Sequence, residues 1–162
     1  MKHKMRRIRQ LLAEKDALEI LANGTNGILS LVNADGEPYG VPISYAYDFD
    51  GNIYFHSAPQ GHKIDCVNND SRCSFCVVAQ DLIVPEEFTT YFRSVIARGR
   101  IEILHDPAEI TKGLLLLCEK YSPGIDSADE IARCMRSVRV LRLHIEELSG
   151  KESIELVRAR LL

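Results

Sequence analysis

Hydrophobic and polar residues alternate along several short segments of this chain, and this pattern is typical of half-buried β-strands. It predicts six strands, at residues 28–32, 41–47, 52–56, 72–79, 91–104 and 138–145. Turn residues such as Asn33-Ala-Asp-Gly36 separate them. Pro42 cannot donate a hydrogen bond to a neighbouring strand, so we expect it at a sheet edge or a bulge. Gly99 lies in the longest predicted strand and indicates a bulge there.

Helical patterns lie between these strands. They predict helices at residues 6–22, 62–69, 106–121, 127–136 and 152–161. Asp106-Pro107 provides a cap and a proline for the first turn of the third helix, and Ser127 with Glu130 reads as a capping box for the fourth. On the third helix, Lys112 and Lys120 fall on the side expected to face solvent.

Antiparallel strands joined by tight turns, with helices inserted between them, predict an α+β fold that is mainly β. The arrangement expected is a small barrel with peripheral helices. At 162 residues, with 46% hydrophobic and 27% charged residues, the chain is expected to form one globular domain, residues 1–162.

The charge is distributed unevenly. The chain has a net charge of −3, but five of its 20 basic residues lie within residues 1–9. Residues 10–162 therefore carry 15 basic against 23 acidic residues, a balance of −8. A body of this charge is a poor partner for nucleic acid. We expect the basic N-terminal arm, residues 1–9, to be a solvated terminus and not a binding element.

Several features point to the cytoplasm. Glu14, Lys15 and Asp16 interrupt the only candidate apolar stretch of a signal peptide. The longest apolar run, residues 114–118, is far shorter than the ~20 residues of a membrane span. Five cysteines form an odd set without scaffold spacing. Cys73 and Cys76 lie three apart within a predicted strand, so their side chains point to opposite faces and no metal site is expected.

The segment from Tyr54 to Lys63 carries the strongest chemical signal. A strand ends here, Gly61 permits unusual backbone angles, and a short helix follows. The N–H groups at a helix start favour anions, and His62 and Lys63 add donors and charge at the same point. The segment fits a phosphate site. A plain strand-to-helix turn with two solvated basic residues would have the same sequence features.

The same segment, Tyr54-Phe-His-Ser-Ala followed by Gly61-His-Lys, resembles the FMN-binding signature of the pyridoxamine 5′-phosphate oxidase-like split-barrel flavoproteins. The most similar branch is that of the 5-nitroimidazole resistance proteins, or nitroimidazole reductases. Four further pieces agree in order, between about residues 5 and 155: Met5-Arg-Arg, Pro38-Tyr-Gly-Val-Pro-Ile-Ser-Tyr45, Tyr91-Phe-Arg-Ser-Val-Ile96 with Gly99 after it, and Ser149-Gly-Lys151.

The resemblance implies a six-stranded antiparallel split β-barrel with FMN at the interface of a homodimer. The implied cofactor-binding positions fall into three groups. The phosphate would lie near Ser57, Gly61, His62 and Lys63, with Ala58 in the same loop and His56 near the flavin. The isoalloxazine would lie along Pro42, Ile43 and Ser44, with Ser94 and Val95 nearby. Arg98 and Lys151 would reach the site of the other subunit, or they are ordinary surface charges.

The expected function is that of an FMN-dependent oxidoreductase, a nitroreductase or flavin reductase that uses a reduced nicotinamide donor and a small-molecule redox substrate. His56 is the candidate catalytic residue, because a neutral imidazole can donate to flavin or relay a proton; the alternative is a strand-end histidine bonded to backbone. The tryptophan- and arginine-rich C-terminal segment of true pyridoxamine phosphate oxidases is missing, which argues against vitamin oxidation. A protein of the same fold that binds flavin or haem without turnover remains the alternative, and no nucleic-acid or membrane partner is expected.

Overall fold

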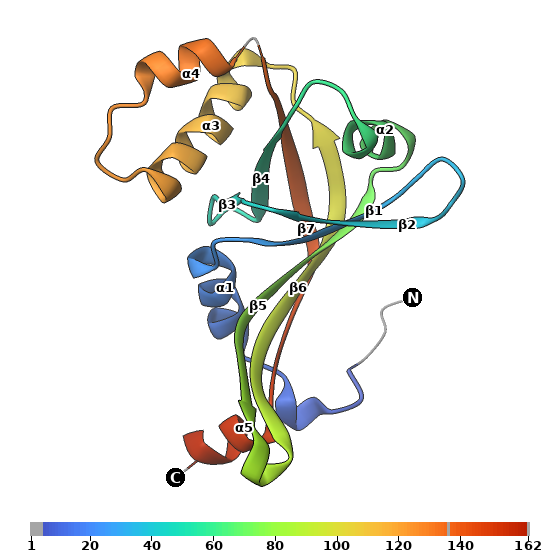
Figure 1. Ribbon diagram of the computed structural model, residues 1–162, viewed down its shortest axis with the longest axis vertical. Coiled ribbons are helices and arrows are strands. Elements are labelled where there is room, and N and C mark those ends of the chain that lie inside the picture. The colour runs from blue at the N-terminus through green and yellow to red at the C-terminus, as the bar shows by residue number, and fades with distance from the viewer. Residues whose placement is uncertain (1–4, 136, 162) are drawn as a thin grey trace.

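The computed structural model describes residues 5–135 and 137–161. Lys2 and Lys4 of the basic arm, and the expected end of the fourth helix at Arg136, lie outside the described residues. A curled antiparallel sheet with the strand order β2-β1-β5-β6-β7-β4-β3 forms the body (Figure 1). Its strands are β1 (Gly27–Val32), β2 (Pro38–Ile43), β3 (Ala46–Tyr47), β4 (Asn52–Ser57), β5 (Arg72–Val84), β6 (Thr89–Ile103) and β7 (Arg139–Glu152).

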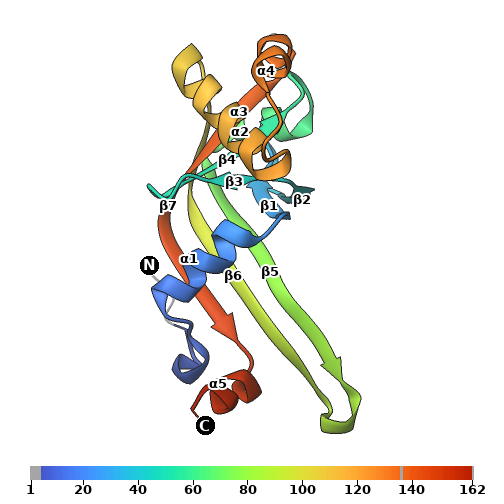
Figure 2. The same ribbon diagram turned by 90° about the vertical axis from the view of Figure 1, so that its left-hand side faces the viewer.

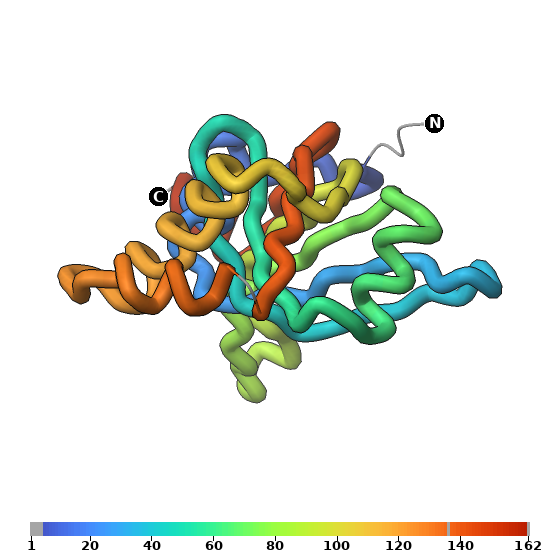
Figure 3. The backbone as a smooth tube through the Cα atoms, turned by 90° about the horizontal axis from the view of Figure 1, so that it is seen from above, coloured from blue at the N-terminus to red at the C-terminus, as the bar shows by residue number. Residues whose placement is uncertain are grey.

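Helices flank this sheet on several sides. They are η1 (Ile8–Gln10), α1 (Glu14–Asn23), α2 (His62–Asn69), η2 (Pro85–Glu87), α3 (Pro107–Tyr121), α4 (Ala128–Cys134) and α5 (Ile154–Arg160). Seen from above, α3 and α4 lie on one side of the body, and α2 lies on the other side with β1 and β2 (Figure 3). The fold is therefore α+β and mainly β, as the sequence predicts.

The sheet has seven strands and not the six expected, because the segment at 41–47 is divided. β2 pairs with β1 at one edge of the sheet, and β3 pairs with β4 at the other. Between them the chain crosses the barrel at Tyr45, whose side chain is fully buried. The Tyr121 hydroxyl holds this crossing, since it accepts from the Tyr45 N–H at 2.9 Å and donates to the Tyr45 carbonyl at 3.0 Å. Pro42 lies on an edge strand, as predicted.

The first helix is shorter than expected and begins at Glu14, not at residue 6. The residues just before Glu14 pair with β7 instead of forming a helix. Leu11 bridges to Lys151 of β7, and the Leu12 N–H donates to the Gly150 carbonyl at 3.0 Å. These contacts keep residues 11–13 extended, so only the short η1 forms before them.

Two strands, β5 and β7, run beyond their predicted ends. β7 continues to Glu152, so the last helix begins at Ile154 with Ser153 as its cap, not at 152. β5 and β6 continue together past the sheet as a two-stranded arm, which projects from the body in Figure 2. The bulge at Gly99 is confirmed, because the β6–β7 register shifts between Arg98 and Gly99.

The helix caps are confirmed in part. Asp106 accepts a hydrogen bond from the Glu109 N–H at 3.1 Å and caps α3, as predicted. The capping box at Ser127 is wrong, since the Ser127 side chain makes no cap bond. Asp126 accepts from the Ala128 N–H at 3.0 Å in its place, and Glu130 pairs with Arg133.

Two apolar clusters hold the fold together. The larger one fills the inside of the curled sheet and includes residues of α1 and α2. The smaller one lies between the outer side of β4 and β7 and the helices α3 and α4, around Tyr54, Leu114 and Val140. The two faces of the sheet therefore differ: the inner face is buried, and the outer face is covered by helices only at the β4–β7 end.

Candidate functional site

The start of α2 combines a glycine of positive φ, a helix end without a side-chain cap and a half-buried lysine. Gly61 precedes it with φ of 127°, a backbone conformation that favours glycine, and the space beside its Cα is open. No side chain caps the helix, so its first N–H groups have no side-chain acceptor. Lys63 lies half-buried in the first turn, and burial lowers its pKa. Within residues 5–135 and 137–161 it forms no ion pair, which leaves a partly desolvated cation at the positive end of a helix.

His62 connects this helix start to β2. Its ring lies edge-on to the ring of Tyr39, with centroids 4.4 Å apart, and its Nε2 is 3.8 Å from the Cys66 Sγ. Tyr39 precedes Pro42 by three residues, which is about 10 Å along an extended strand. The predicted phosphate residues and the predicted isoalloxazine strand therefore lie side by side in one chain, on the side of the body where α2 flanks β1 and β2 (Figure 1).

The outer edge of β2 offers main-chain groups. The Asn33 N–H donates to the Glu37 carbonyl at 3.0 Å, so this pair of the β1–β2 hairpin is hydrogen-bonded. Hydrogen-bonded and non-hydrogen-bonded pairs alternate along an antiparallel ladder. Given the register Ile28 to Pro42, the alternation turns the main-chain groups of Gly40 and Ser44 and the carbonyl of Pro42 away from β1. No described strand pairs with that edge.

Four of the predicted cofactor-binding residues share the outer face of the sheet. The register aligns a row across five strands: Pro42, Ile28, Cys76, Ile96 and Ser149. Ser94 and its partner Lys151 lie on the same face one step along, and Arg98 lies one step in the other direction, paired with Glu147. The Arg98 guanidinium is 3.7 Å from the Glu147 carboxylate, and the Lys151 ammonium lies 5.3 Å from the centre of the Phe92 ring.

The remaining predicted residues divide between the inner face and the loop. Val95 and Ser57 point into the core and are buried, and Ile43 is turned the same way. Their side chains are therefore removed from the outer face, and only their main-chain groups are available on it. Ala58 is exposed in the loop that leads to α2.

His56 lies far from the outer-face residues of its own chain. It is exposed on β4 opposite Val140 of β7. Lys151 follows Val140 by eleven positions along β7, a path of roughly 35 Å measured along the curved strand. One chain thus brings together His62, Lys63 and the β2 edge, but it does not bring His56 to Lys151. Within the described part of the chain, His56 has no hydrogen-bonding side chain as a partner.

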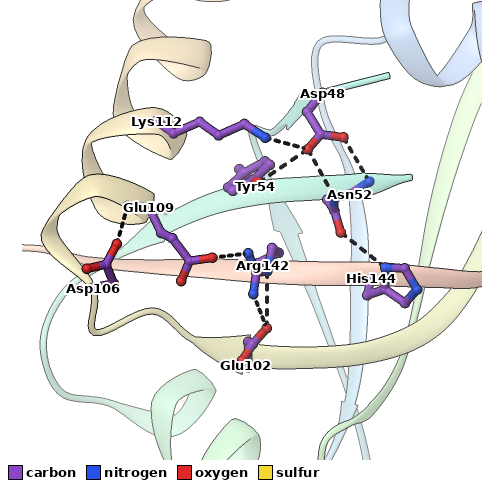
Figure 4. A network of polar contacts seen from close by, with 9 residues as sticks. All are labelled: Asp48, Asn52, Tyr54, Glu102, Asp106, Glu109, Lys112, Arg142 and His144. Atoms are coloured by element: carbon purple, nitrogen blue, oxygen red, sulfur yellow. Dashed lines mark hydrogen bonds and ion pairs between the residues drawn. The ribbon is translucent and has the colours of Figure 1, made fainter. Parts of the chain in front are cut away.

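A polar network on β4, β7 and α3 was not predicted as a unit (Figure 4). Asp48, whose side chain is 1% exposed, accepts from the N–H of Asn52 at 3.0 Å, the Tyr54 hydroxyl at 3.3 Å and the Lys112 ammonium at 3.1 Å. Burial alone would raise the pKa of Asp48, but the hydrogen bonds from Asn52, Asp50 and Lys112 hold it below its ordinary value. The pairing of Asp48 with Lys112, 64 residues away, had no local signal in the sequence.

The neighbouring Arg142 extends the same network. Its guanidinium pairs with Glu102 of β6 at 2.7 Å and with Glu109 of α3 at 2.5 Å. These contacts join α3 to three strands. The network therefore fixes the helix that covers the outer side of β4 and β7, and it brings no free acid or base toward the start of α2.

Residues 5–135 and 137–161 contain neither a cluster of metal ligands nor a helix that could span a membrane. Among the described residues, no group of three histidine, cysteine or carboxylate side chains is placed to hold a metal ion, and Cys73 and Cys76 are both free. None of the helices in the described part of the chain has the length and apolar character needed to cross a membrane.

The curled antiparallel sheet with a free β2 edge beside the start of α2 is the arrangement of a split-barrel protein of the pyridoxamine 5′-phosphate oxidase type. The chain belongs to the pyridoxamine 5′-phosphate oxidase family, whose model matches residues 13–152. No curated protein sequence matches the chain.

Solved structures share this fold. A candidate 5-nitroimidazole antibiotic resistance protein from Bacteroides thetaiotaomicron is 21% identical, with a TM-score of 0.75 over 88% of this chain and 86% of that one. An FAD-binding protein from Mesorhizobium loti is 26% identical, with a TM-score of 0.66 over 89% and 97%. A flavocytochrome from Azotobacter vinelandii is 21% identical, with a TM-score of 0.74 over 97% and 78%.

Proposed function

We propose that this protein is an FMN-dependent oxidoreductase, a nitroreductase or flavin reductase that takes electrons from a reduced nicotinamide. The observation that carries the proposal is the contact between His62 and Tyr39, which sets an anion-binding helix start beside the free edge of β2. Bound there, FMN would supply the redox chemistry, and the chain would supply position and charge.

The donor set fits that cofactor. A dianionic phosphate at Gly61, His62 and Lys63 would give the half-buried ammonium a charged partner. The polar edge of a flavin ring has both donors and acceptors, which match the N–H and carbonyl groups that Gly40, Pro42 and Ser44 turn away from β1. The relatives that bind FAD use a flavin with the same ring system, so the phosphate end decides between FMN and FAD.

We further propose that the working unit is a homodimer. His56 lies on β4 and Lys63 at the start of α2, whereas Ser94 and Lys151 are paired on the outer face of β6 and β7. A second copy would supply Arg98 or Lys151 to the first. The row of apolar side chains on the outer face, at Ile28, Val78 and Ile96, is exposed in the single chain and suits such an interface. The free cysteines fit a reducing cytoplasm.

The choice of electron acceptor follows from similarity and not from a residue. The likeness to a candidate nitroimidazole resistance protein favours nitro compounds as substrates. The alternative is flavin or haem binding without turnover, and one observation favours it: in the described part of the chain, no acid or base is assembled around His56. The two functions predict different kinetics.

The test is a flavin titration followed by stopped-flow reduction. The purified protein should take up FMN with a visible flavin absorbance band, and NADH or NADPH should bleach that band. A nitroimidazole should then restore it within seconds. Failure to bind any flavin would refute the whole proposal. Flavin binding without reduction by either donor would support the binding role, and a Soret band on haemin addition would support the haem version of it.

A further inference from the structure

The tip of the β5–β6 arm, residues 81–88, is exposed on a ribbon that lacks a third strand. The β1–β5 pairing ends at Cys76, and the β6–β7 pairing ends at Arg93. Beyond these residues the two strands pair with each other, and α5 and its cap add only the hydrogen bonds from the Ser153 N–H to the Phe92 carbonyl, at 3.0 Å, and from the Thr89 hydroxyl to Glu155, at 3.4 Å. A two-stranded ribbon with so little support is marginally stable in water. Ile83 is nevertheless 71% exposed and Phe88 is 98% exposed. The arm therefore presents apolar surface far from the core that would normally cover it (Figure 2).

No contact within its own chain accounts for the conformation and the exposure of Phe88. Its φ is 51°, a left-handed conformation that is unusual for a bulky residue, and its ring packs on nothing in the described structure. The same tip carries Asp81, Glu86 and Glu87 and has no basic residue. The arm tip is thus both apolar and acidic, with a formal charge of −3.

The N-terminal segment, residues 6–11, has the opposite character. It carries Arg6, Arg7 and Arg9, a formal charge of +3, and within the described part of the chain none of them pairs with a carboxylate. Ile8 between them is 72% exposed. The segment is fixed in place, because Gln10 is buried and the main chain of Leu11 bridges to Lys151. The segment therefore forms a fixed part of the protein surface and is not a free tail.

We propose that the arm tip of one copy docks on the N-terminal segment of a second copy, and that the second arm tip returns the contact. A two-fold dimer produces both contacts at once, because residue i meets residue j and residue j meets residue i. The two surfaces match in charge, −3 against +3, and each has exposed apolar side chains to bury. Docking would also place the partner's arm next to Leu11 and Lys151. The inference names a partner surface for the homodimer of the proposed function, but the docking itself does not require flavin.

The apolar half of the contact is tested with Phe88→Asn. Asparagine accepts the left-handed conformation, and the side chain is exposed, so the fold should be unaffected. Sedimentation of the full chain over a range of concentrations should show a dimer dissociation constant raised by at least about tenfold. Phe49→Asn is the matched control, because Phe49 has φ of 62° and is 75% exposed on a different turn; its dimer should match the parent. Circular dichroism checks that both variants are folded.

The charged half is tested with two charge-reversed chains. One carries Arg at positions 86 and 87 through Glu86→Arg and Glu87→Arg, and the other carries Arg6→Glu and Arg7→Glu. In each chain alone the tip and the segment have like charges, so self-association should weaken, and more so at low salt. An equal mixture should associate as a heterodimer, because each tip then faces a segment of opposite charge.

Three results would overturn the docking: a parent that stays monomeric at every concentration, variants that dimerise as the parent does, or a mixture that associates no better than its components. The same samples are titrated with FMN. If the variants dimerise as the parent does and all bind FMN, the docking is refuted and the proposed function stands. If dimerisation follows the charge pattern but no sample binds FMN, the docking stands and the proposed function is refuted.

Discussion

Replacing Lys63 by alanine removes the ammonium group that we assign to the flavin phosphate. Burial lowers the pKa of Lys63, which shows that its charge is partly desolvated, and no carboxylate of the described chain compensates it. A phosphate dianion would do so. Hydrogen bonds to charged groups contribute about 1.5–3 kcal/mol, and 1.4 kcal/mol corresponds to tenfold in affinity. FMN affinity should therefore fall by about ten- to a hundredfold in Lys63→Ala, while the weaker binding of riboflavin, which lacks the phosphate, should hardly change.

The assay is quenching of flavin fluorescence, with FMN and riboflavin titrated into the same preparations. The control must be chosen from the structure. Lys112 and Lys120 were expected on the solvent face of their helix, but Lys112 binds the buried Asp48. The Lys120 ammonium lies 3.9 Å from the centre of the Tyr45 ring, and its burial lowers its pKa to about 8. Lys15 is exposed on α1 and is the better control. Equal FMN affinity in Lys63→Ala and the parent would show that the phosphate binds elsewhere.

Two further predictions concern stability and are measured by chemical denaturation. Asp48→Ala should lower the free energy of unfolding by about 2–4 kcal/mol, because it leaves the partly buried donors of Asn52 and Tyr54 without an acceptor. The pKa of Asp48 in the folded protein lies below its unfolded value of about 3.9. The stabilisation by Asp48 is therefore present above about pH 3.9 and is lost as the pH falls through the folded pKa, so the unfolding free energies of parent and variant should converge in acid. A constant difference between them down to low pH would contradict this prediction. Gly99→Ala should cost about 3 kcal/mol or more, because its Cβ would lie 1.8 Å from the His144 carbonyl oxygen, whereas Gly40→Ala, with 3.5 Å to the nearest atom, should cost much less; equal losses would show that the bulge can relax.

The fold class and most elements followed from local pattern. Alternation of apolar residues located the strands, Asp106-Pro107 located the start of α3, and Gly99 located a bulge, because each of these signals acts within a few residues. The division of residues 41–47 into β2 and β3 did not follow. It depends on the Tyr121 hydroxyl, which lies 76 residues from Tyr45 and has no sequence signal of its own.

The ends of helices and strands were predicted least well, because they too depend on contacts between residues far apart in the sequence. Residues 6–13 have a helical pattern, but Leu11 and Leu12 bond to the end of β7, and this contact overrides helix propensity. The strand β7 was expected to stop at 145, because alternation fades where the strand loses its one-sided burial. β5 was expected to stop at 79 and continues to Val84 for that reason too, whereas β6 was predicted to within two residues at each end.

For the candidate site, the sequence by itself determined the chemistry of the phosphate end: Gly61, His62 and Lys63 at a helix start, where unpaired N–H groups and charge coincide. Only the tertiary structure decided which other residues can join them. Strand order put the free edge of β2 beside that helix, and pairing along β7 put His56 and Lys151 at positions eleven residues apart on that strand. Pairing between distant strands is set by the packing of the whole sheet, and no window of sequence contains it.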